Sequence, residues 1–147
     1  MAKSDFWFHH VFRVRYAEVD AQAIVFFGNY MTYFDSAHME YLRAISFDYR
    51  DYTERRNADI HTVRVETDYY APARLDDLIE VYVRTGHIGR SSMRIFFEVY
   101  RAGEEELLTA AQSVLVNANK TDMKSTPWPV DLVKMIVGRE IKPVERH

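Results

Sequence analysis

Apolar and polar residues alternate with a period of two in several separate stretches of the chain, which is typical of β-strands with one buried face. In residues 92–101, for example, Met93, Ile95 and Phe97 share one face while Arg94 lies on the other. The alternation is partial near the N-terminus and clearer further along. The pattern predicts five strands, at residues 9–16, 60–71, 77–86, 92–101 and 106–119.

Residues 29–45 follow a different period, because their apolar side chains recur every three or four positions. This spacing predicts a helix with an apolar stripe. Met31 and Met39 extend the apolar surface beyond that stripe, so we expect a sheet to bury the helix on several sides. Asn29 is the predicted N-cap, since its side chain can accept a hydrogen bond from the first helical turn.

The remaining segments are mostly short connections. A hairpin turn is expected at 102–106, where Gly103 provides a permissive backbone, and a short terminal helix at 130–138. Short connections favour antiparallel neighbours, so one sheet and one long helix form an α+β domain that covers residues 1–147. The connection 17–28 is too apolar for a solvated loop, and we expect it to be buried with its polar groups paired.

Composition and charge exclude several classes of function. The net charge is -3 with acids and bases interspersed, which gives no nucleic-acid-binding footprint. The chain has no cysteine, so disulfides, thiol nucleophiles and thiolate metal ligands are excluded. Its histidines lack metal-ligand spacing and no serine-nucleophile elbow is present. We therefore expect neither a metal site nor a serine triad.

The chain also lacks the signals of secretion and membrane insertion. Its N-terminal region has no long apolar segment followed by a cleavage site, and no apolar run approaches the ~20 residues of a membrane span. We therefore expect a soluble, cytoplasmic protein without a membrane span. Apolar residues make up 48% of the chain, with ten Tyr and nine Phe, which favours self-association through part of this surface.

Two carboxylates, Glu18 and Asp20, precede an apolar segment that ends at Gly28, where the helix is expected to begin. The N–H groups at a helix start can polarise a thioester carbonyl. Asp20 would then act as a nucleophile or as a general base for water. From spacing alone, an equally good reading makes Asp20 a turn residue and gives Gly28 only the relief of backbone strain.

This stretch resembles the hot-dog-fold thioesterases of the 4-hydroxybenzoyl-CoA thioesterase type, including the YbgC-like acyl-CoA thioesterases. Residues that match the family signature are Glu18, Asp20, Ile24, Val25, Asn29 and Tyr30. Downstream, 70–77 resembles the family's proline-containing segment, and 89–92 resembles its polar turn. The resemblance covers residues 9–120.

The resemblance implies a curved antiparallel five-stranded sheet wrapped around one long helix. It implies an acyl-CoA thioesterase that hydrolyses an aromatic or short-chain acyl-CoA, with Asp20 as the catalytic residue. No cofactor is expected, because coenzyme A is part of the substrate. Members of the family are dimers, often paired into homotetramers, with active sites shared between subunits.

The resemblance also assigns the other site residues. The backbone at Phe27 and Gly28 is expected to polarise the thioester carbonyl. Substrate-binding positions fall on Asn29, His61 and Thr62, and coenzyme A-binding positions on Arg90, Ser91 and Ser92.

Two residues depart from the family pattern. Ala23 stands where the family usually has glycine, which bears on the pocket or on the turn. Phe27 stands where YbgC-like members often have histidine, so one polar contact is lost.

Three alternatives accompany this interpretation. Asp35 would be the catalytic carboxylate if it faced the pocket, because a second class of hot-dog thioesterases carries its acid on the helix; otherwise it is an exposed acid in ion pairs at helical spacing. The protein could also bind acyl-CoA or an acyl carrier without catalysis. A hydratase or dehydratase ranks lowest, since no histidine lies in the segment before the helix.

Overall fold

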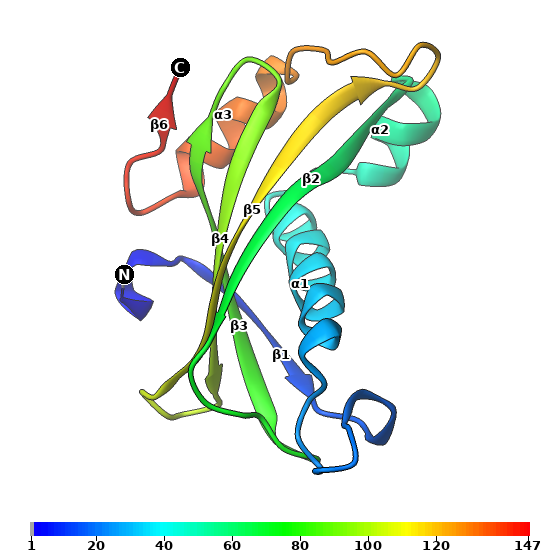
Figure 1. Cartoon of the computed structure of the whole chain (residues 1–147). Helices are drawn as coiled ribbons and strands as arrows, with labels where there is room; N and C mark the ends of the chain where they lie inside the picture. Colours follow the sequence, from blue (N-terminus) through cyan, green and yellow to red (C-terminus); the bar gives the residue numbers. More distant parts are fainter. Residues whose placement is uncertain (1) are drawn as a thin grey trace.

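The computed structural model describes residues 2–147 as a curved sheet whose concave side holds one long helix (Figure 1). The sheet runs in the order β1-β3-β4-β5-β2, and all neighbours along this path are antiparallel. Its strands are β1 (Phe8–Arg13), β2 (Ala58–Tyr69), β3 (Leu78–Ile88), β4 (Ser92–Arg101) and β5 (Leu107–Asn119). The five predicted strands and their antiparallel pairing are confirmed. The hairpin between β4 and β5 is also confirmed, with Gly103 at a φ of 78°.

The long helix α1 (Tyr30–Ala44) packs its apolar stripe against the sheet. Phe34 stacks on Phe97 of β4 with their ring centroids 4.7 Å apart. The buried residues of the helix are Tyr30, Tyr33, Phe34, Ala37, Tyr41 and Leu42. The prediction that the sheet buries the helix on several sides is wrong for a single chain, because Thr32 and Asp35 are exposed.

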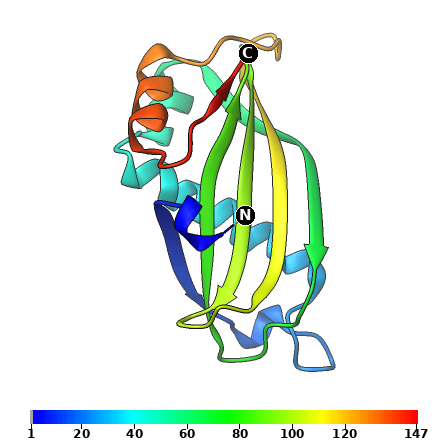
Figure 2. The same cartoon turned by 90° about the vertical axis from the view of Figure 1, so that its left-hand side faces the viewer.

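Smaller elements surround this framework. Helix α2 (Tyr49–Arg55) was not predicted; the Asp48 side chain caps it by accepting a hydrogen bond from the Asp51 N–H. The terminal helix α3 (Val130–Arg139) is confirmed. A sixth strand, β6 (Glu145–Arg146), pairs parallel with the end of β3, so the sheet has one strand more than expected (Figure 2). No helix within residues 2–147 is long and apolar enough to cross a membrane.

The connection before α1 is a compact structure of its own. The first strand ends at Arg13, earlier than expected, and residues Tyr16–Glu18 form a 3₁₀ turn, η2. A bridge between Val19 and Val25 then closes a small hairpin. The prediction that this connection is buried is wrong for most of it: within residues 17–28 only Glu18 and Val25 are buried, whereas residues 21–23, Phe26 and Phe27 are exposed. Backbone hydrogen bonds nevertheless hold the hairpin together and join it to its neighbours.

Ala23 has a φ of 61° at the end of that hairpin loop. The Ala23 N–H donates to the Asp20 carbonyl at 2.9 Å, and the Asp20 N–H donates to the Ile24 carbonyl at 2.9 Å. These bonds define a three-residue hairpin loop whose last residue adopts the left-handed conformation that glycine favours. The turn therefore provides a backbone reason for the glycine that the family usually has here.

We expect Ala23→Gly to stabilise the protein. The substitution removes left-handed strain of about 1–2 kcal/mol, while the greater freedom of glycine in the unfolded chain offsets about 0.4–1 kcal/mol of that gain. Urea denaturation should therefore give a free energy of unfolding higher by up to about 1.5 kcal/mol. A lower free energy of unfolding in the variant would contradict the conformation of this turn.

Candidate active site

A pocket of about 340 Å³ lies where the connection meets the start of α1. It is lined by Asp20, Ile24, Val25, Phe27, Tyr30, Tyr69, Tyr70, Ala71 and Pro72. Asp20 and Phe27 thus border the same space, as expected. The remaining wall comes from the end of β2 and the loop that follows it. The tyrosines of this wall were not predicted as site residues, because nothing in their spacing relates them to Asp20.

The hairpin holds Asp20 at the pocket by its backbone and by one oxygen of its side chain. Asp20 Oδ1 accepts a hydrogen bond from the Gln22 N–H at 2.8 Å. No second protein donor binds this carboxylate within residues 2–147. Asp20 is therefore a turn residue and a pocket residue at once, and the two interpretations of the sequence are compatible.

The side chain of Glu18 holds the hairpin in place through hydrogen bonds and an ion pair. Its carboxylate is 8% exposed and accepts hydrogen bonds from the Arg15 N–H at 2.8 Å and the Tyr33 hydroxyl at 2.7 Å. The Arg15 guanidinium donates to the other oxygen at 2.8 and 2.9 Å. Burial works to raise the pKa of Glu18, but these hydrogen bonds and the charge of Arg15 outweigh it and hold the pKa below its usual range. The ionised carboxylate therefore ties the hairpin to α1.

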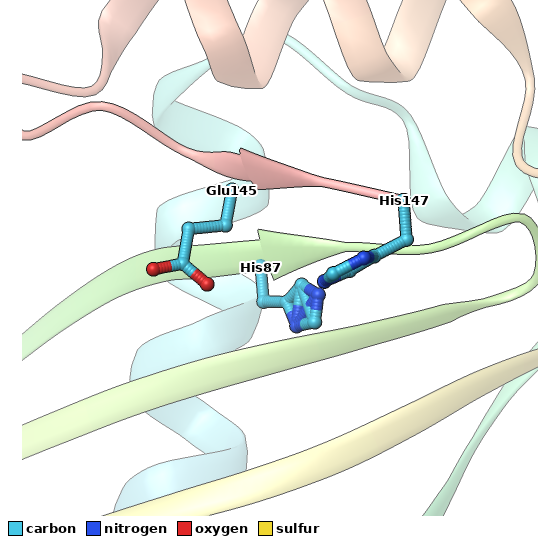
Figure 3. Close-up of side chains that lie close together, drawn as sticks. All are labelled: His87, Glu145 and His147. Atoms are coloured by element: carbon cyan, nitrogen blue, oxygen red, sulfur yellow. The ribbon is translucent and has the colours of Figure 1, made fainter.

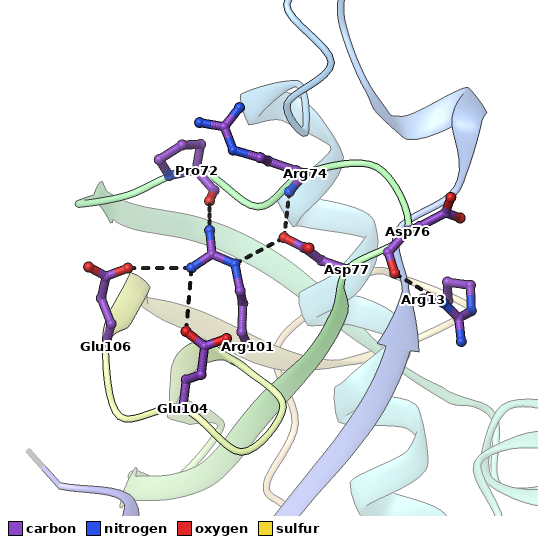
Figure 4. A network of polar contacts seen from close by, with 8 residues as sticks. All are labelled: Arg13, Pro72, Arg74, Asp76, Asp77, Arg101, Glu104 and Glu106. Atoms are coloured by element: carbon purple, nitrogen blue, oxygen red, sulfur yellow. Dashed lines mark hydrogen bonds and ion pairs between the residues drawn. The ribbon is translucent and has the colours of Figure 1, made fainter.

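The loop at 70–77 forms the opposite wall and depends on Arg101 of β4 (Figure 4). The Arg101 guanidinium donates to the Pro72 carbonyl at 2.5 Å and to the Asp77 carboxylate at 3.0 Å. The Asp77 carboxylate also accepts a hydrogen bond from the Arg74 N–H at 2.8 Å. Backbone contacts join this loop to the hairpin, including Val25 N–H to the Ala73 carbonyl at 2.9 Å. One cation therefore fixes the wall facing Asp20.

The helical segment begins earlier than α1. Residues Phe27–Asn29 form a 3₁₀ turn, η3, that continues directly into Tyr30. The N–H groups of Phe27 and Gly28 are therefore the first of the helical segment and have no carbonyl one turn earlier. Phe27 is 63% exposed and lines the pocket. A Cβ on Gly28 would lie 2.9 Å from the Phe26 ring, so the close approach of that ring explains the glycine.

Asn29 has a different role from the one predicted. Its backbone is already helical, and its side chain caps nothing. The Asn29 amide instead donates to the Glu18 carbonyl at 2.8 Å. Asn29 does not line the Asp20 pocket. It acts with Glu18 to hold the hairpin against the helix.

A second cavity, of about 530 Å³, lies between α1 and strands β2 and β5. Thr62, Asp35 and His38 line it together with apolar residues. Desolvation lowers the pKa of His38 to about 4, so its ring is neutral near pH 7. Asp35 was interpreted as an ion-pair residue, but Arg43 pairs with Glu40 instead. Asp35 therefore faces a cavity, although not the one that Asp20 lines.

His61 lies beside Thr62 on β2, and its buried Nε2 has no hydrogen-bond partner within residues 2–147. These two residues lie near the start of β2 and do not line the Asp20 pocket. Only Tyr69, at the other end of the strand, lines it. Within one chain, Thr62 therefore lines a different cavity from Asp20, and His61 lines neither of the two.

The predicted coenzyme A-binding turn lies at the far end of the sheet. Its backbone carbonyls at Arg90 and Ser92 accept hydrogen bonds from Trp128, at 3.0 and 2.9 Å. Strand β3 separates this turn from the loop beside Asp20 (Figure 1). Its eleven residues correspond to roughly 30 Å. One chain therefore does not bring Arg90, Ser91 and Ser92 to Asp20.

Comparisons with known proteins identify the family of the chain. Residues 22–108 match the family model described as the thioesterase superfamily; Asp20 lies just before that range. The acyl-CoA thioester hydrolase YbgC of Escherichia coli O6:H1 is 29% identical over 121 residues, which cover 82% of this chain and 89% of YbgC. The acyl-CoA thioesterase YbgC of Haemophilus influenzae is 26% identical over 120 residues, covering 82% of this chain and 87% of that protein.

Among solved structures, a 1,4-dihydroxy-2-naphthoyl-CoA thioesterase from Synechocystis superposes with a TM-score of 0.82 at 20% identity. The alignment covers 88% of this chain and 94% of that one. This likeness confirms the hot-dog architecture inferred from the sequence. Together with the family match, it shows that the chain belongs to the thioesterase superfamily, a family of thioester hydrolases.

Proposed function

We propose that this protein hydrolyses an aromatic or short-chain acyl-CoA, with Asp20 as the catalytic residue. The observation that carries the proposal is the pocket in which the Asp20 carboxylate and Phe27, at the start of the helical segment, border one space. A carboxylate and a set of free N–H donors are the two groups that thioester hydrolysis needs.

The proposed chemistry divides between these two groups. The N–H groups of Phe27 and Gly28 polarise the thioester carbonyl and stabilise the negative charge that develops on its oxygen. Asp20 either attacks the carbonyl carbon or removes a proton from an attacking water. The C–S bond then breaks, the CoA thiolate leaves and takes up a proton, and one water is consumed to give the free carboxylic acid.

The pocket walls support a flat or short acyl group. Phe27, Tyr30 and Tyr69 place three aromatic rings around a space of about 340 Å³. The Tyr69 hydroxyl donates to the Phe27 carbonyl at 3.0 Å, which fixes this wall to the helix start. Aromatic rings that are already held in place favour stacking with an acyl ring.

We propose further that the active site is completed by a second copy of the chain. In its own chain, the turn that carries Arg90, Ser91 and Ser92 lies at the opposite end of β3, a strand of roughly 30 Å, from the loop beside Asp20, so we assign its contact with coenzyme A to the site of a neighbouring subunit. Strand β2 offers the surface for association. It is an edge strand with an unpaired side, and it exposes Val63 and Val65.

We expect Asp20→Asn to lower kcat for acyl-CoA hydrolysis by about 100-fold or more, because the amide is neither a nucleophile nor a base. The measurement is free-thiol release from acetyl-, medium-chain, benzoyl- and phenylacetyl-CoA. Asp122→Asn is the matched control, since Asp122 also accepts a hydrogen bond from the N–H two residues later but lies outside the pocket.

Asp35→Asn separates the two candidate carboxylates in the same assay. Full activity in Asp20→Asn, with loss in Asp35→Asn, would move the chemistry to the second cavity. Binding of acyl-CoA without thiol release from any substrate would make the protein a non-catalytic binding module.

We expect Glu18→Gln to lower the free energy of unfolding by about 1–2 kcal/mol at pH 7, because the ionic hydrogen bonds with Arg15 are lost. The folded-state pKa of Glu18 is lowered, so its contribution is present above the unfolded value of 4.5 and is lost as pH falls below it. The difference between variant and wild type should therefore shrink in acid. Urea denaturation at several pH values measures it; a pH-independent difference would contradict the ionised state of Glu18.

The same variant tests positioning. Because Glu18 holds the hairpin and does not line the pocket, kcat should fall with little change in KM. Tyr33→Phe removes only one donor to Glu18 and should give a smaller effect on both quantities.

We expect Val63→Glu to convert an oligomer to a monomer and to reduce hydrolysis, because it places a charge on the apolar edge of β2. Light scattering after size exclusion gives the mass. Val137→Glu on α3 is the control, since Val137 is 46% exposed but lies away from β2. A monomeric wild type with full activity would refute the shared site.

A further inference from the structure

Three side chains that could bind a metal meet at the end of β3 that is distant from Asp20. They are His87 of β3, Glu145 of β6 and His147, the residue after β6. Each offers a ligand atom, and these atoms lie within 4.8 Å of one another. Figure 3 shows the His147 ring pointing towards the His87 ring, with the Glu145 carboxylate on the other side of His87. The sequence predicted no metal site, because almost sixty residues separate the two parts of this cluster.

Strand pairing explains why the three side chains converge. His87 pairs with Glu145 in the parallel register of β3 and β6, and the His147 N–H donates to the Ile88 carbonyl at 3.1 Å. Residues two apart in an extended segment share a face, so Glu145 and His147 flank His87 on the same side. The register of β3 with β4 also shifts between Thr85 and His87, and such bulges re-aim side chains at strand ends.

One nitrogen of the His87 ring lacks a hydrogen-bond partner in the part of the chain that the structure describes. Its Nε2 is buried and has no hydrogen-bond partner within residues 2–147, and the His147 ring centroid is only 4.0 Å from its own. A buried polar atom without a partner is costly. A cation between the two rings would give the Nε2 lone pair a partner and would also attract the Glu145 carboxylate.

We propose that His87, Glu145 and His147 form a binding site for a divalent transition-metal ion of the zinc class, which fastens β6 to β3. Two imidazole nitrogens and one carboxylate oxygen suit Zn²⁺, whereas Mg²⁺ and Ca²⁺ prefer all-oxygen sites. Zinc ligands lie at about 2.0–2.2 Å from the metal, so the exposed side chains of Glu145 and His147 close on the ion by rotating. The fourth position is left to water.

Two features define the character of this site. Arg94 lies opposite His87 on β4, and its positive charge opposes a cation there, so the affinity is moderate. Strand β6 has only two paired positions with β3, so a metal bridge adds substantially to its attachment. The ion has a structural role, because β3 separates it from the Asp20 pocket.

Calorimetric titration of the full chain with ZnCl₂, after removal of metals with a chelator, tests the proposal. We expect one Zn²⁺ to bind per chain, Tm to rise with added Zn²⁺, and Mg²⁺ to produce neither effect. His147→Gln should weaken Zn²⁺ binding by at least about tenfold. This variant changes an exposed side chain, so it leaves the core intact.

His9→Gln is the matched control. His9 is also an exposed histidine near a carboxylate, 4.0 Å from Glu80, but within residues 2–147 the pair has no third ligand group close enough to share a metal. Zn²⁺ binding should be unchanged in it. Absence of Zn²⁺ binding by the wild type, binding that His147→Gln leaves intact, or equal weakening in His9→Gln would each overturn the proposal.

Discussion

The buried carboxylate of Glu18 is the interaction on which the Asp20 pocket depends. The connection before α1 has an irregular backbone, whose polar groups need partners where it packs against the rest of the chain. Glu18 provides them in two directions: its side chain binds Arg15 and Tyr33, and its carbonyl accepts from the Phe26 N–H and the Asn29 amide. The end of β1, the hairpin and the start of α1 are thereby joined at one point. The position of Asp20 follows from this junction rather than from contacts of its own side chain.

The regular part of the fold was predictable because its periodicity is long and consistent. Strand β5 alternates from Thr109 to Asn117, β3 and β4 alternate over their first six residues, and α1 keeps its stripe for fifteen. Short elements carry too little pattern: α2 buries only Tyr52, and β6 has two residues. The Asn29 cap failed for a local reason, since a 3₁₀ turn starts the helical segment at Phe27 and leaves Asn29 already helical.

The candidate site was also predictable only in part, namely where its residues are close together in the sequence. Asp20, Phe27 and Gly28 lie within nine residues of one another, so local structure alone brings them together. The facing wall, with Tyr69 and Tyr70, comes from a strand forty residues later, and only the tertiary arrangement reveals it. Ala23 shows a subtler limit: its departure from the family pattern was visible in the sequence, but the reason is a positive φ that no spacing discloses.

The two edges of the sheet differ, and this difference affects whether copies of the chain can associate into an open-ended polymer. Strand β1 is short and carries His9, His10 and Arg13, whereas β2 has twelve residues, exposed valines and a bulge between Thr62 and Arg64. Joining β1 of one copy to β2 of the next would build an open fibre, but the two edges match poorly in length and polarity. In the association proposed through β2, the same edge of two copies pairs about a two-fold axis, and such a pair is closed. The difference between the two edges would then favour a finite assembly over a polymer.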